Sequence, residues 1–176
     1  RDISMSDDYA SICGITEEEL RRYFDAEVEV FAKKQHVDKY AMYEMLKQKY
    51  DGYHFSSNSE DIYNPFSLLN SLKTRSLSNY WFATGTPTYL VKILSKSNVD
   101  IPEFEGDLLA NGEMLAAFGN GESNLIAALY QSGYLTIKGS SKSFYELGFP
   151  NEEVSEGLTQ VLIPNYVASQ TSDRKD

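Results

Sequence analysis

YDGYHF, residues 50–55, ends a run of apolar residues at helical spacing and separates helical sequence from the more mixed sequence that follows. Glycine readily takes the left-handed backbone conformation that closes a helix, so Gly52 is predicted to lie just past a helix end. The hydrophobic contact usual at such ends would need an apolar residue near Gln48, so Tyr53 is expected to pack elsewhere. We predict an aromatic corner that contains Tyr53, Phe55, Tyr63 and Trp81.

Two helices are predicted before this motif. Thr16 and Glu19 form a capping box, and the apolar spacing after it predicts one helix that continues to about Lys34. Asp38 is the predicted N-cap of a second helix, which ends at Tyr50. Each helix carries an apolar stripe, so both are expected to lie on a core.

Start signals for four more helices follow the motif. Asn64-Pro65 and Thr86-Pro87 each place proline at the first helical position, where its fixed backbone and missing N–H are tolerated. Ser123 is the predicted cap of a short helix that reaches Gln131, and Asn151 is the predicted cap of the last helix.

A β-hairpin is predicted over residues 134–147. The segments 134–137 and 143–147 are rich in β-branched and aromatic residues and flank a predicted turn at 139–141. Residues 98–122 are acidic and contain several glycines, so they are expected to form a loop with a short strand or helix in it. A helix that leads straight into a hairpin resembles a winged helix.

These patterns predict a mainly α protein with a small β-hairpin, which is an α+β fold made of a helical bundle and a winged-helix-like unit. We expect a helical region over 1–100, the winged-helix-like region over 101–150, and a helix with the start of a linker over 151–176. With 176 residues and 41% hydrophobic content, the chain is long enough to bury one good core.

Composition excludes several classes of protein. The longest apolar stretches, 80–83 and 125–130, are far shorter than the roughly 20 residues of a membrane helix, so no contact with a membrane is expected. Cys13 is the single cysteine, which excludes an internal disulfide, and it is expected to be a small buried hydrophobe. These features fit a cytoplasmic protein. The first residue is not methionine and no leader follows it, so we expect a piece of a longer protein.

The sequence contains no signature of a catalytic centre. Neither GxxxxGK[ST] nor GxGxxG occurs, and no cofactor is predicted for this chain. His36 and His54 lack metal-ligand spacing, so structural roles are favoured for both. The acidic stretch with Glu103 and Asp107 could hold a cation, which keeps a metal-dependent hydrolase as a rival, but it lacks a calcium-loop pattern. We predict no catalytic and no metal-binding residue.

Residues 64–100 form the one basic block of a chain whose net charge is −10, with four basic residues and one acidic residue. Aromatic residues interleave with the lysines there, as in surfaces that stack on bases and follow phosphates. A nucleic-acid-binding module that uses this block is the alternative function. A core corner with lysines at its rim is favoured, because the acidic remainder of the chain repels phosphates. Direct binding of nucleic acid is therefore not expected.

Several segments, taken jointly and in this order, resemble bacterial AAA-ATPase-like proteins that carry a C-terminal PD-(D/E)xK-type nuclease domain. The resemblance covers nearly the whole chain, and its segments are Asp2–Met5 (DISM), Ile12–Leu20 (ICGITEEEL), Tyr50–Phe55 (YDGYHF), Tyr63–Leu69 (YNPFSLL), Tyr80–Pro87 (YWFATGTP), Tyr130–Ile137 (YQSGYLTI) and Leu147–Val154 (LGFPNEEV).

The resemblance implies that this chain is the middle region, between an upstream ATP-binding core that uses ATP and Mg²⁺ and a downstream nuclease-like domain. The expected function is a noncatalytic lid or coupling region, and the expected partners are those two domains. The family's catalytic residues have no counterparts here. The family-motif residues expected at an interface are Tyr50, Asp51, Gly52, Tyr53, Phe55, Tyr63, Asn64, Pro65, Trp81, Gly85, Thr86 and Pro87.

Overall fold

The computed structural model describes residues 6–56, 59–84, 90, 94, 108–116 and 125–160. The predicted α+β class is confirmed, because several helices accompany one small antiparallel sheet. In chain order the elements are η1 (Asp7–Tyr9), α1 (Glu17–Tyr23), α2 (Asp25–Gln35), α3 (Lys39–Tyr50), α4 (Pro65–Thr74), η2 (Phe82–Thr84), β1 (Leu108–Ala110), α6 (Gly112–Ala116), α7 (Leu125–Gln131), β2 (Thr136–Ser141) and β3 (Phe144–Gly148), and residues 152–160 form a further helix.

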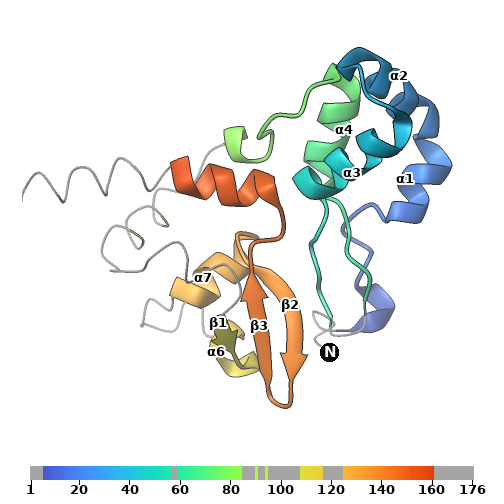
Figure 1. Cartoon of the computed structure of the whole chain (residues 1–176). Coiled ribbons are helices and arrows are strands. Elements are labelled where there is room, and N and C mark those ends of the chain that lie inside the picture. The colour runs from blue at the N-terminus through green and yellow to red at the C-terminus, as the bar shows by residue number, and fades with distance from the viewer. Residues whose placement is uncertain are drawn as a thin grey trace, which may run out of the picture.

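The elements gather into two groups. Figure 1 shows α1, α2, α3 and α4 on one side and the sheet with α6 and α7 on the other. We call the first group the helical lobe and the second group, together with helix 152–160, the sheet lobe. Within the described residues, none of the helices combines the length and apolar character that a membrane crossing needs.

The helical lobe begins with the predicted capping box. The Thr16 hydroxyl accepts from the Glu19 amide at 3.2 Å, and the Glu19 carboxylate accepts from the Thr16 amide at 3.0 Å. The prediction of one helix to about Lys34 is wrong, because Phe24 leaves the helical conformation (φ −127°, ψ 13°) between α1 and α2. Tertiary contacts hold the restart: the Asp25 carboxylate accepts from the Tyr43 hydroxyl at 2.9 Å. Apolar spacing continues across the break and does not reveal it.

The core of the helical lobe lies between its four α-helices. Asp38 caps α3 as predicted, since its carboxylate accepts from the Ala41 amide at 2.8 Å. Asn64 caps α4 in the same way, with Pro65 in the first turn. The buried apolar residues of this core are Leu20, Val28, Phe31, Ala32, Met42, Tyr43, Leu46, Tyr50, Tyr63, Leu68 and Leu72.

A narrow ribbon leaves the helical lobe through the YDGYHF motif. Helix α3 ends at Tyr50, and Gly52 has φ +97°, so the predicted helix stop is confirmed. Tyr53 then pairs with Ile62 in an antiparallel bridge, and Tyr63 pairs with Ile15 in another. In Figure 1 the two strands of this ribbon run side by side away from α3 and α4.

The sheet lobe contains an antiparallel sheet in the order β1-β3-β2. The hairpin is confirmed, but the turn predicted at 139–141 is wrong, because the chain turns at Lys142, which has φ +57°. Gly139 lies inside β2 and serves a different purpose. The pairing register with β3 shifts between Ile137 and Gly139, and a glycine inside a strand is typical of such an irregularity.

The core of the sheet lobe draws residues from widely separated segments. Tyr53 and Ile62 of the ribbon contribute to it, although they precede residue 101. The helices predicted after Thr86-Pro87 and at the C-terminal end contribute Leu90, Leu94, Val154 and Leu158, and the other buried members are Ala110, Leu115, Ala128, Leu129, Tyr134, Leu135, Ile137 and Leu147. The expected short strand and helix within 98–122 are confirmed as β1 and α6.

Candidate functional site at the junction of the lobes

The predicted aromatic corner borders a hollow of about 310 Å³ between the two lobes. Six of the candidate residues line this hollow, namely Tyr53, Phe55, Tyr63, Asn64, Pro65 and Trp81. Segment 130–136 from the sheet lobe supplies most of the other lining residues. The candidate residues Gly85, Thr86 and Pro87 lie outside the residues that the structure describes.

The rings of the predicted corner do not form one cluster, because Tyr63 lies in the core of the helical lobe and Tyr53 in that of the sheet lobe. Tyr53 stacks on Phe55 with ring centroids 6.5 Å apart and an interplanar angle of 14°. Trp81 packs against Tyr134 with centroids 5.0 Å apart. Gly133, at φ +79°, lies beside both groups, since a Cβ atom there would be 3.7 Å from Trp81 and 3.8 Å from Tyr53. Such distances are ordinary van der Waals contacts, so the positive φ, and not a lack of space, favours glycine where α7 closes.

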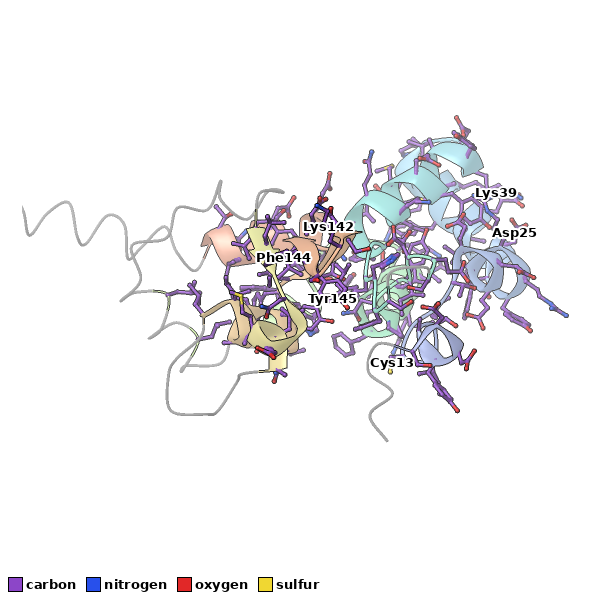
Figure 2. The ribbon with its side chains drawn as sticks, turned by 90° about the horizontal axis from the view of Figure 1, so that it is seen from below. Cys13, Asp25, Lys39, Lys142, Phe144 and Tyr145 are labelled. Atoms are coloured by element: carbon purple, nitrogen blue, oxygen red, sulfur yellow. The ribbon has the colours of Figure 1, made fainter. Side chains whose placement is uncertain are left out.

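A second hollow of about 340 Å³ adjoins the first and shares Cys13, Phe55, Tyr130 and Gln131 with it. The expectation that Cys13 is buried is wrong, because the short turns before Ile15 hold it on the surface. In Figure 2 Cys13 lies on the side of the helical lobe that is toward the sheet lobe.

Sequence reasoning missed Tyr9, Ile12 and Tyr130 as lining residues. Tyr9 and Ile12 are 46% and 73% exposed. The sequence signal for these two was that large apolar residues occur in a short segment without helical or strand periodicity, where no core position is expected. None of the described residues that line either hollow carries a charge. Such a neutral, aromatic surface suits contact with another protein surface better than contact with phosphates.

Below the corner, the remaining motif residues connect the ribbon to the sheet lobe. The Asp51 carbonyl accepts from the Asn151 side chain at 2.9 Å. A Cβ atom at Gly52 would lie 2.1 Å from the Pro150 carbonyl oxygen, so the two segments touch through backbone. The Lys138 ammonium donates to the Pro150 carbonyl at 3.1 Å. The candidate residues Asp51 and Gly52 are therefore structural parts of the junction, whereas Tyr50 is buried in the core of the helical lobe.

Two buried carboxyl groups, Asp51 and Glu153, and the exposed Lys138 of β2 occupy this junction. Burial raises the pKa of Asp51 to about 6, although the hydrogen bond that the carboxylate accepts from the Gly52 amide lowers this pKa. Burial also raises the pKa of Glu153, and desolvation lowers the pKa of Lys138. In each case the environment disfavours the charged form.

The other candidate chemistry does not assemble. His36 ends α2, whereas His54 lies on the ribbon with its Nδ1 3.0 Å from the Asp61 carboxylate. No group of three or more metal-ligating side chains is found among the described residues. The acidic stretch with Glu103 and Asp107 lies outside them.

Two described aromatic residues of the basic block, Tyr80 and Trp81, make contacts within the fold. Trp81 packs on Tyr134, and the Tyr80 hydroxyl donates to the Ser76 carbonyl at 3.1 Å. The described basic residues Lys73 and Arg75 are exposed at the end of α4. Tyr89, Lys92 and Lys96 lie outside the described residues, so the alternative of a stacking surface stays a prediction.

Comparison with known proteins relates the chain to a longer bacterial protein. It is 32% identical over 175 residues to a protein of Azotobacter chroococcum mcd 1 described as an "Uncharacterized protein in vnfD 5'region". The match covers 97% of this chain and 31% of that protein, so the chain spans about a third of the length of the relative. No protein-family model and no solved structure matches the chain.

Proposed function

We propose that this chain is a noncatalytic lid or coupling region of an AAA-ATPase-like protein, and that it transmits nucleotide state to a downstream nuclease-like domain. The observation that carries the proposal is the neutral, aromatic double hollow at the junction of the two lobes. Its lining comes from four of the segments in which the resemblance lies, 12–20, 50–55, 63–69 and 130–137, with Trp81 from a fifth.

The position of the hollow explains why such a site would couple domains. It contacts the ribbon, both lobes and the N-terminal turns at once. A protein surface seated there would favour one arrangement of these segments over others, and a ligand shifts an equilibrium by its difference in affinity for the two states. The ATP-binding core is the proposed occupant.

The element order also agrees with the winged-helix part of the proposal. Strand β1 precedes α6 and α7, the β2–β3 hairpin follows them, and β1 pairs with β3. The described helix that would enter a DNA groove, α7, contains no basic residue. A protein contact therefore suits this unit better than nucleic acid.

The proposal is tested in the longer protein that it implies. Tyr9→Ser and Ile12→Ser remove exposed apolar surface from the second hollow, so they should change ATP turnover by several-fold while the melting temperature stays constant. Tyr40→Ser is the matched control, because Tyr40 is 71% exposed on α3 and does not line either hollow. ATP turnover that equals the wild-type value in all three variants would contradict the proposal.

A second measurement separates the alternative function. Short single-stranded DNA should show no low-micromolar binding to the chain at low salt. Binding that weakens steeply as salt is added would instead support a nucleic-acid-binding module.

A further inference from the structure

The two lobes are joined by a small set of polar contacts, which we call the joint. Helix 152–160 supplies two of them: the Glu153 carboxylate shares a hydrogen bond with the Ser67 side chain of α4, and Glu156 pairs with Lys49 of α3 at 2.5 Å. Asn151 supplies a third through the Asp51 carbonyl. The same Asn151 side chain caps the helix by accepting from the Val154 amide, so this helix start and the joint depend on one residue.

The ribbon and strand β2 complete the joint. The Thr136 hydroxyl lies 2.8 Å from the His54 amide and 2.9 Å from the His54 carbonyl. Lys138 donates to carbonyl oxygens on both sides, Gly52 at 3.4 Å and Pro150 at 3.1 Å. Hydrogen bonds of this kind stabilise the contact modestly and are individually replaceable by water.

Two buried carboxylates oppose these contacts. Asp51 is 4% exposed and Glu153 is 0% exposed. One oxygen of each carboxylate, Oδ1 of Asp51 and Oε2 of Glu153, has no hydrogen-bond partner among the described residues. A buried charged group that lacks part of its hydrogen bonding costs free energy, and separation of the lobes would return it to water.

The charged neighbours compensate this cost only in part. The closest cation to Asp51 is Lys47, whose ammonium is 3.9 Å from Oδ2, and Asp61 and Glu17 add unfavourable charge. Lys49 acts on Glu153 from a distance while it pairs directly with Glu156. The other titratable groups that interact with these two carboxylates are Lys138, Tyr50, Tyr53 and Tyr63.

We propose that the joint is a latch, in which the contacts of residues 151–156 hold the lobes together and the buried carboxylates Asp51 and Glu153 keep the closed form close in free energy to an open form. The two buried clusters share no residue, and the ribbon residues Tyr53 and Ile62 belong to the cluster of the sheet lobe. This inference rests on the proposed coupling function and identifies the movement that would carry the signal.

The latch is tested by the distance between two spin labels in the chain, one on each lobe. Tyr40→Cys on α3 and Phe144→Cys on β3 provide exposed attachment sites, 71% and 47% exposed, and Cys13→Ser removes the native thiol. Figure 2 shows Phe144 on the sheet lobe, apart from Lys39, which begins helix α3. Two resolved distances are expected at pH 7.5, one for each state of the latch.

Three variants of this labelled chain then shift the balance in opposite directions. Asp51→Asn and Glu153→Gln remove a buried charge, and each should increase the fraction of chains at the closed distance. Glu156→Gln breaks an ion pair of the latch and should lower that fraction. Glu29→Gln is the control, because it breaks an ion pair with Lys33 on the surface of α2, away from the joint.

Two results would overturn the latch: a single distance common to all variants, or a shift to the open form in Asp51→Asn and Glu153→Gln. These measurements need neither nucleotide nor another domain. If the spin labels give a single distance while Tyr9→Ser and Ile12→Ser change ATP turnover, the latch is rejected and the proposed function stands. If the labels show two distances that shift as expected while Tyr9→Ser and Ile12→Ser leave ATP turnover unchanged, the latch stands and the proposed function is rejected.

Discussion

Asp51→Asn should make the protein more stable at neutral pH, and the gain should disappear in acid. Burial raises the pKa of Asp51 from 3.8 to about 6, so the folded protein binds a proton that the unfolded chain releases. The contribution of this carboxyl to stability is therefore fully present below pH 3.8 and is lost as the pH rises through about 6. Above that pH the folded protein carries a buried charge.

The magnitude follows from the same two pKa values. At 1.36 kcal/mol per pKa unit, the loss between the two limits is about 3 kcal/mol, an order-of-magnitude figure. Asparagine has nearly the same shape and keeps an oxygen to accept from the Gly52 amide, but it carries no charge. The free energy of unfolding of Asp51→Asn should thus exceed that of the wild type by up to about 3 kcal/mol at pH 7.5.

Urea unfolding at pH 4, 5, 6 and 7.5, followed by circular dichroism, measures this difference. The comparison of variant with wild type at each pH cancels the titration of the other carboxylates. Glu27→Gln is the control, since Glu27 is exposed on α2, and its difference from the wild type should stay within about 0.5 kcal/mol. If Asp51→Asn is destabilising at pH 7.5, or if its difference does not change with pH, the reasoning about a penalised buried charge is wrong.

Two further predictions concern residues of the same region. Gly52→Ala should lower the free energy of unfolding by about 2 kcal/mol or more, because φ is +97° and the added methyl group would meet the Pro150 carbonyl at 2.1 Å. Urea unfolding measures this change. A loss of less than about 0.5 kcal/mol would contradict the described contact. Cys13 should react with a thiol reagent at the rate of an unfolded control within a factor of about ten, since it is exposed in the folded chain. A reaction that proceeds only in urea would show it to be covered.

Local signals predicted much of the helical lobe. The caps at Thr16, Asp38 and Asn64 each depend on a side chain that bonds to a backbone amide two or three residues away. Such contacts need no knowledge of the rest of the fold. The break at Phe24 escaped prediction because it is held by the Tyr43 hydroxyl on another helix. A periodic pattern carries no information about that contact.

Glycine shows the same division between local and tertiary causes. The helix stop predicted at Gly52 is confirmed, since α3 ends at Tyr50 and Gly52 has a positive φ. Gly139 is predicted as a turn residue, but it lies within β2, where the pairing register with β3 shifts between Ile137 and Gly139. Lys142 makes the turn instead, in a left-handed conformation that a lysine seldom adopts. The two uses of glycine look alike until the partner strand is known.

The sequence predicted aromatic residues of the candidate site but not the buried carboxylates beside it. Aromatic residues can be identified from the sequence alone, and Tyr53 and Phe55 of the YDGYHF motif do border the hollow. Asp51 and Glu153 looked like ordinary helix-terminal acids, whose usual role is to face solvent near a helix end. Their burial depends on contacts between segments about a hundred residues apart, such as that of Asn151 with the Asp51 carbonyl. Because a stable core alone does not need two incompletely paired carboxylates, their place between the lobes is the reason to expect movement there.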